Sequence, residues 1–212
     1  MTNGGRHPFP NGRRGGTIHG DLITVLVVDD HPAVRTGLRS VLRYEPGLIW
    51  VGEAVTAGEA TAIAGRLRPD VVLADYHLPD EDGLVLCTKL KAEEPSMGVL
   101  IYSAYAGAAL AVPALLAGAD GLVDKSALGR DLFDAIRTVA RGDHAFPEIP
   151  REHLRAAAGR LEPGDVPVLG MLLERTTLAD VATTLGIEPW QLQARLLAMI
   201  GRLRVETTIP AT

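Results

Sequence analysis

Five apolar runs, rich in β-branched residues, alternate with segments of helical periodicity, and this alternation constrains the fold more than any other feature. Continuous apolar runs of this length are typical of strands that are buried on both faces of a sheet. Strands that alternate with helices predict a parallel sheet with helices on both faces, an α/β fold. The five runs are ITVLVV (23–28), LIWVGEA (48–54), DVVLAD (70–75), GVLIYS (98–103) and DGLVD (120–124).

Polar side chains stand where these strands end. Asp29 and Asp30 follow the first strand, Asp75 ends the third, Ser103 ends the fourth and Lys125 follows the fifth. Ligands of parallel sheets bind beyond the carboxyl ends of the strands, so these residues are expected at one ligand-binding edge. Three neighbouring carboxylates repel one another unless a cation lies among them, and oxygen ligands select Mg²⁺ or Ca²⁺.

Each of these polar residues also has a simpler interpretation. The two acids after the first strand can cap the next helix, Asp75 can begin a turn, and Lys125 can be a solvated loop residue. The coincidence of all five at one edge favours a site instead. An aspartate beside a cation can act as a nucleophile toward a phosphoryl group, which Lys125 and the Ser103 hydroxyl would stabilise. The acids of the following loop, Asp80, Glu81 and Asp82, are interpreted as loop and helix cap rather than ligands.

The alternation stops after residue 141. The stretch GDHAFPEIPREHLRAAAGR (142–160) is interpreted as a linker, with a helical turn possible at 151–158. Three helical segments follow, near 163–174, 178–185 and 188–203, and Gly186-Ile187 separates the last two. Short helices around a glycine-containing turn predict a helix-turn-helix.

Charge is distributed unevenly along the chain. Residues 1–20 carry a net charge of +3, residues 21–150 carry −8, and residues 151–212 are neutral. The acidic middle suits cation binding and argues against nucleic acid on that segment.

A single cysteine, Cys87, excludes an internal disulfide and is expected in the core. No apolar run approaches the ~20 residues of a membrane span. The first 20 residues, rich in Gly, Pro and Asn, are interpreted as a disordered tail.

Four motifs make a resemblance specific: VVDDHPAVRTGL, VVLADYHLPDEDGL, IYSAY and GADGLVDKS. They resemble the receiver domain of two-component response regulators, and with the domain order they resemble the NarL/FixJ subfamily with its LuxR-type output. The resemblance implies a doubly wound, flavodoxin-like five-stranded receiver followed by a small all-α helix-turn-helix domain. The implied organisation is a tail at 1–20, a receiver at 21–145, a linker at 146–160 and a degenerate output domain at 161–212.

The resemblance also implies roles for the strand-end residues. Asp75 would be the phosphoacceptor of a sensor histidine kinase, Ser103 the switch hydroxyl and Lys125 the lysine that contacts the phosphoryl group. Mg²⁺ would be held by the side chains of Asp29, Asp30 and Asp75 and by the backbone carbonyl of His77. The expected protein is a cytoplasmic transcription regulator rather than an enzyme, without membrane attachment, which forms a homodimer on activation.

The output segment departs from its family. Pro167 falls in its first helix, where a missing N–H would shorten or shift the helix. In the third helix the family usually has a lysine near Gln193 and a histidine near Arg195. Base contacts are expected from Gln191, Gln193 and Arg195, and phosphate contacts from Arg202 and Arg204 on double-stranded DNA. The neutral charge of 151–212 leaves open that this face is merely solvated.

A further departure concerns switching. The receiver pattern usually has an aromatic residue three positions before the lysine, and Leu122 occupies that position. One alternative is therefore an atypical regulator with weakened or absent phospho-switching whose output binds protein. A separate alternative is a phosphatase with an aspartyl nucleophile. Haloacid-dehalogenase-type phosphatases have a second aspartate two residues after the nucleophile, and here that residue is His77.

Overall fold

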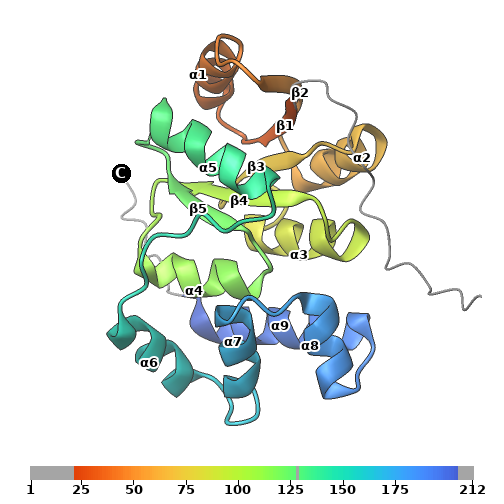
Figure 1. Ribbon diagram of the computed structural model, residues 1–212, viewed down its shortest axis with the longest axis vertical. Helices are drawn as coiled ribbons and strands as arrows, with labels where there is room; N and C mark the ends of the chain where they lie inside the picture. Colours follow the sequence, from red (N-terminus) through yellow and green to blue (C-terminus); the bar gives the residue numbers. More distant parts are fainter. Residues whose placement is uncertain (1–21, 128, 205–212) are drawn as a thin grey trace, which may run out of the picture.

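A computed structural model describes residues 22–127 and 129–204 (Figure 1); the expected disordered tail at 1–20 lies outside them. Five parallel strands form one sheet in the order β2-β1-β3-β4-β5. This arrangement confirms the predicted doubly wound parallel sheet. The strands are β1 (Ile23–Val28), β2 (Leu48–Ala54), β3 (Val71–Asp75), β4 (Gly98–Ser103) and β5 (Gly121–Asp124).

Helices cover both faces of the sheet. Helices α1 and α5 pack on one face through a cluster that includes Leu38 and Ile136. Helices α2, α3 and α4 pack on the other face, where Leu84, Cys87 and Leu116 are fully buried. The burial of Cys87 confirms its predicted place in the core. The bounds are α1 (Pro32–Leu42), α2 (Ala57–Leu67), α3 (Gly83–Glu93), α4 (Ala108–Leu116) and α5 (Arg130–Ala140).

Local sequence signals fix where these helices begin. Pro32 is the first residue of α1, a position where its missing N–H is tolerated. The Thr56 hydroxyl caps α2 by accepting a hydrogen bond from the Glu59 N–H at 3.1 Å. Asp82 caps α3, as expected for that loop, and its Oδ1 accepts a hydrogen bond from the Leu84 N–H at 2.6 Å. The helix that follows β3 therefore starts close to the end of that strand.

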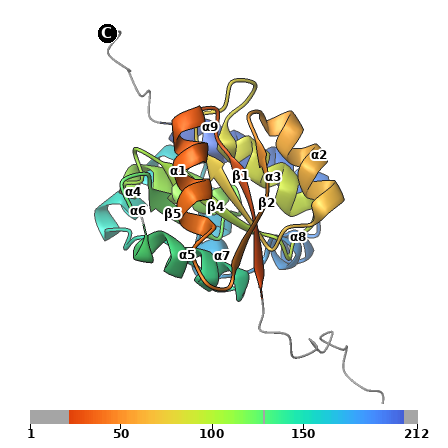
Figure 2. The same ribbon diagram turned by 90° about the horizontal axis from the view of Figure 1, so that it is seen from above.

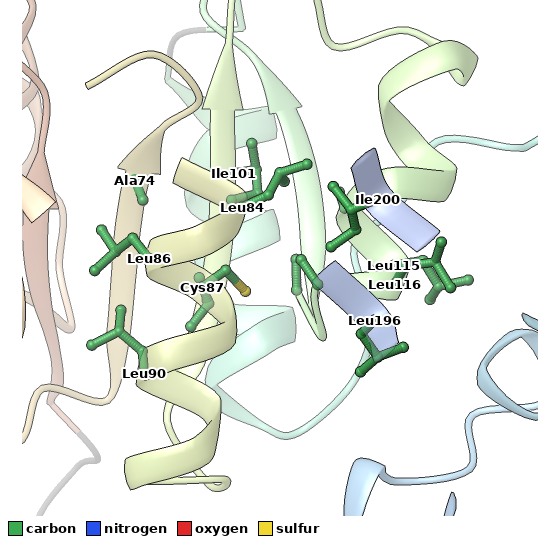
Figure 3. Close-up of a cluster of buried hydrophobic side chains, with 14 of the residues drawn as sticks. Ala74, Leu84, Leu86, Cys87, Leu90, Ile101, Leu115, Leu116, Leu196 and Ile200 are labelled. Atoms are coloured by element: carbon green, nitrogen blue, oxygen red, sulfur yellow. The ribbon is translucent and has the colours of Figure 1, made fainter. Parts of the chain in front are cut away.

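Four further helices follow the receiver-like fold: α6 (Arg151–Arg160), α7 (Val166–Leu173), α8 (Leu178–Leu185) and α9 (Pro189–Leu203). We refer to α6–α9 as the C-terminal helices. Figures 1 and 2 show them gathered on the α3–α4 side of the sheet, away from α1. Leu196 and Ile200 of α9 join one continuous buried cluster with Leu115 and Leu116 of α4 (Figure 3). The C-terminal helices are thus docked on α4 through apolar side chains.

The C-terminal helices differ from the sequence expectation in two places. A full helix, α6, occupies 151–160, where a linker with a helical turn was predicted, because Ala157 and its neighbours find a partner surface on α4. Helix α7 begins at Val166 rather than near 163, and Pro167 lies in its first turn, where proline is tolerated.

Gly186 ends α8 with a left-handed φ of 64°, which glycine adopts at no steric cost. Among the described residues, no helix combines the length and hydrophobicity needed to cross a membrane.

Candidate functional site

The carboxyl ends of the central strands bring the predicted polar residues to one edge of the sheet. Val28 pairs with Ala74, so Asp29 and Asp75 follow at the same level of β1 and β3. Asp75 is in register with Tyr102, one residue before Ser103, and Ser103 is in register with Asp124, one residue before Lys125. The parallel register, rather than sequence proximity, therefore assembles this site.

Lys125 bridges two of the carboxylates. Its Nζ lies 2.7 Å from Asp29 Oδ2 and 2.8 Å from Asp75 Oδ2. Asp29, Asp75 and Ser103 are all buried, with at most 4% of their surface exposed. Ser103 Oγ accepts a hydrogen bond from the Tyr105 N–H, which orders the loop after β4. A half-buried cation between two buried anions makes a compact, strongly polar centre at the end of an apolar sheet.

The pKa values of Asp75 and Lys125 reflect two opposing effects, burial of each group and the opposite charge beside it. Burial raises the pKa of Asp75, although the Lys125 ammonium opposes that rise. Burial alone would lower the pKa of Lys125, but hydrogen bonds to Asp29 and Asp75 outweigh it and leave that pKa raised. Lys125 therefore stays protonated at neutral pH. Asp75 is held in surroundings where additional positive charge would favour its ionised form.

The acidic pair fits a divalent cation. One ligand atom from each of Asp29, Asp30, His31 and Asp75 lies within 4.8 Å of the others. Oxygen atoms dominate this set, as Mg²⁺ requires. Sequence reasoning missed His31, whose Nδ1 lies 2.6 Å from Asp30 Oδ1. Its place directly after the two aspartates was the available signal. The His77 carbonyl, the remaining expected ligand, belongs to the loop that follows Asp75, and the His77 side chain is exposed.

The loop after β3 is packed tightly against Asp75. Gly83 donates its N–H to the Tyr76 carbonyl at 2.8 Å. A Cβ at Gly83 would lie 2.1 Å from the Asp75 carbonyl oxygen, so only glycine allows α3 to start here. Asp82, the cap of α3, uses its second oxygen, Oδ2, to pair with Arg204 at the end of α9 at 2.9 Å. This loop therefore touches both the phosphoacceptor candidate and the C-terminal helices.

Leu122, the departure from the receiver pattern, lies in β5 with 4% of its surface exposed. It belongs to the buried cluster that α4 and the C-terminal helices share. Tyr102 lies on the opposite face of the sheet, and its hydroxyl donates to the Lys125 carbonyl at 3.1 Å. Tyr102 is therefore held to the backbone of Lys125, on the face of the sheet away from α4.

The residues expected to contact DNA are engaged within the chain. Arg195 pairs with Asp165 at 2.7 Å, and Arg202 pairs with Asp165 at 3.3 Å and with Glu162. The other three are also engaged or enclosed: the Gln191 side chain accepts a hydrogen bond from the Glu188 N–H, Gln193 lines a cavity against α3, and Arg204 pairs with Asp82. The arrangement does not present these side chains as one free, positively charged surface.

Comparison with known proteins agrees with the fold. The family model of the response regulator receiver domain matches residues 25–137. The chain belongs to the response regulator family. This response regulator is similar to the DNA-binding transcriptional activator DevR/DosR of Mycobacterium tuberculosis. The two are 34% identical over 196 aligned residues, which are 86% of this chain and 90% of DevR/DosR.

Solved structures place the regulator in the LuxR-type branch. A two-component response regulator of the LuxR family from Aurantimonas sp. is 34% identical, with a TM-score of 0.56, over 66% of this chain and 98% of that one. RcsB of Salmonella enterica, solved on a promoter with a phosphomimetic, has a TM-score of 0.59 over 89% of this chain and 95% of its own. At 24% identity, RcsB supports the two-part fold alone. The resemblance of the sequence motifs to a response regulator of the NarL/LuxR type is thus confirmed.

Proposed function

We propose that this response regulator accepts a phosphoryl group on Asp75 from a sensor histidine kinase and controls transcription through its C-terminal helices. The observation that carries this proposal is the buried centre in which Lys125 lies within 2.8 Å of both Asp29 and Asp75. An Asp75 oxygen attacks phosphorus, the P–N bond to the kinase histidine breaks, and the released imidazole takes a proton. Lys125 then moves from pairing two carboxylates to pairing the phosphoryl oxygens.

Mg²⁺ is the proposed cofactor, held by Asp29, Asp30, Asp75 and the His77 carbonyl. When bound, it supplies positive charge that neutralises the phosphoryl oxygens beside the acidic side chains. Ser103, at the neighbouring strand end, donates its hydroxyl to a phosphoryl oxygen in this proposal. These assignments are supported by the shared strand-end position of the residues.

The proposed organisation keeps the receiver at 21–145, a connecting segment at 146–160 that contains α6, and an output domain at 161–212. Helices α8 and α9 around Gly186 form the proposed helix-turn-helix, and Gln191, Gln193, Arg195, Arg202 and Arg204 are its proposed DNA contacts. DNA binding is supported by the family membership and by the name of the relative DevR/DosR. The described arrangement, with α9 on α4, represents a resting state from which α9 must be released. Phosphorylation is proposed to release it and to form a homodimer in the cytoplasm.

The phosphorylation step is tested with acetyl phosphate or beryllofluoride in the presence of Mg²⁺. Intact mass and oligomeric state are measured for the wild type and for Asp75→Ala. The expected results are a Mg²⁺-dependent phosphoryl adduct and a dimer for the wild type, and neither for the variant. A wild type that shows no Mg²⁺-dependent change would contradict the phosphoacceptor role.

The output is tested by a salt-dependent gel shift of the activated full chain, with Arg195→Ala as control. Binding that weakens with salt and with the substitution supports DNA contact. Absence of binding at low salt would instead favour an output that binds protein. The pairing of Arg195 and Arg202 with Asp165 is the observation that keeps this second function in view.

A further inference from the structure

A cavity of about 800 Å³ lies between the receiver-like fold and the C-terminal helices. Its receiver wall comes from the end of α3, the following loop and the segment after α5; its other wall comes from the starts of α8 and α9. Small-molecule sites commonly enclose ~300–1,000 Å³, and they occur preferentially where two domains meet. The strand-end residues Asp29, Asp75 and Lys125 do not line this cavity, so it is separate from the phosphorylation centre.

Apolar side chains form most of the wall on the C-terminal side. Leu192 and Leu196 come from α9, and Leu178 comes from the first position of α8. Leu178 also reaches across to the receiver, where its Cδ1 lies 3.0 Å from the position of a Cβ at Gly118. The two parts of the chain are therefore in direct contact beside the cavity, and its apolar wall suits an apolar molecular body.

The charges of the cavity favour an anion. Lys91 and Asp120 pair at 2.8 Å and neutralise each other, and Lys91 also donates to the Met97 carbonyl at 2.9 Å. Arg141 and Arg175 also line the cavity, and neither forms an ion pair within residues 22–127 and 129–204. Two positive charges therefore remain uncompensated at the wall.

Neutral hydrogen-bonding groups accompany these cations. Burial lowers the pKa of His144, so its imidazole is uncharged at neutral pH and can donate or accept a hydrogen bond. Gln193, expected from the sequence to contact DNA, is half-buried and faces this cavity instead. Apolar walls with a few polar groups and an excess of positive charge are the usual construction of a site for an organic anion.

We propose that this cavity binds a small amphipathic anion, whose apolar body packs against Leu178, Leu192 and Leu196 and whose acidic group is held by Arg141 and Arg175. The site goes beyond phosphorylation, because it would give the regulator a second, chemical input. A ligand that contacts both walls binds only the docked arrangement and therefore stabilises it.

The test uses 1-anilinonaphthalene-8-sulfonate, an aromatic sulfonate of the proposed class, with the full chain. Fluorescence titration should show saturable binding to one site. The dissociation constant should rise at least tenfold in Ala92→Trp, which fills the cavity from an exposed position, and in Arg175→Glu, which reverses one charge. The matched controls Ala62→Trp and Arg66→Glu, at exposed positions of α2 outside the cavity, should bind as the wild type does.

The neutral analogue N-phenyl-1-naphthylamine tests the role of charge, and it should bind at least tenfold more weakly than the sulfonate. Near-UV circular dichroism and a cooperative thermal transition verify that each variant is folded. Non-saturable binding, unchanged affinity in both cavity variants, or equal affinity for the neutral analogue would each overturn the proposal.

Discussion

The ion pair between Asp82 and Arg204 connects the loop beside Asp75 to the end of α9, and its removal should favour release of α9. Asp82→Asn is the sharpest perturbation, because asparagine still caps α3 through Oδ1 while it loses the charge that Oδ2 offers to Arg204. Substitution on the receiver side also leaves every proposed DNA contact intact. The variant therefore changes docking without altering the DNA-binding surface.

The magnitude follows from the exposure of the two partners. The side chain of Arg204 is 48% exposed and that of Asp82 is 17% exposed. Exposed ion pairs contribute about 0.2–1 kcal/mol, and the partly buried carboxylate together with the 2.9 Å distance favours the upper end of that range. A loss of about 1 kcal/mol shifts an equilibrium about fivefold. If docking blocks DNA, the unphosphorylated variant should therefore bind DNA up to about fivefold more tightly.

The assay is fluorescence anisotropy with a random-sequence DNA duplex at low salt, measured for the unphosphorylated full chain. A double-mutant cycle with Arg204→Gln isolates the pair from other effects of either substitution. Asp80→Asn is the matched control, because it removes a charge from the same loop but contacts the N–H groups of Ala57 and Gly58 on α2. An equal gain in the Asp80 variant, or a gain that persists in the Arg204→Gln background, would refute the reasoning.

Three further perturbations probe the strand-end centre. Because burial raises the pKa of Asp75, its ionised form destabilises the fold, and Asp75→Asn should increase the free energy of unfolding at pH 7. This gain should vanish as the pH falls below the ordinary aspartate pKa. Urea titrations of both proteins across pH measure it, and a difference in stability that stays constant with pH would contradict the prediction. Lys125→Met leaves Asp29 and Asp75 uncompensated and should cost about 3 kcal/mol, the lower end of the range for breaking a buried ion pair, because Lys125 is partly exposed. Added Mg²⁺ should restore part of this stability in thermal melts, and insensitivity to Mg²⁺ would argue against a shared site. Gly83→Ala should destabilise by about 1–3 kcal/mol through overlap with the Asp75 carbonyl, whereas Gly65→Ala, on the open surface of α2, should be neutral or stabilising by up to about 1 kcal/mol.

The sheet and the polar residues gathered at its edge were accessible from the sequence because both depend on local signals. Buried strands appear as apolar runs, and a polar residue directly after such a run must stand at the strand end. Parallel register then brings Asp29, Asp75 and Lys125 together regardless of their separation along the chain. The site could thus be anticipated before any distance was known. His31 was missed because a histidine after two acids has many local explanations.

The use of the α9 arginines could not be anticipated for a physical reason. A helical pattern shows which side chains are polar, but it does not show which acids they will meet. Arg204 finds Asp82, 122 residues earlier, and Arg195 finds Asp165 at the start of α7. The partner of Arg204 depends on docking, which arises from apolar contacts such as those of Ile200 with α4, whereas the partner of Arg195 depends on how the C-terminal helices fold on one another. Surface charge patterns therefore predicted a DNA-facing helix, whereas the docked arrangement pairs the same charges internally.

The departure of this receiver at Leu122 bears on how a signal would travel. Leu122 has no ring to rotate, and it is buried in the cluster that joins α4 to the C-terminal helices. A change at Asp75 would therefore have to disturb a packed apolar interface to pass through Leu122. The loop after β3 offers a polar route instead, since the Tyr76 carbonyl accepts the Gly83 N–H and the adjacent Asp82 pairs with Arg204. A phosphoryl group on Asp75 that shifts this loop would weaken the Asp82–Arg204 pair first, which is the step that the Asp82→Asn variant imitates.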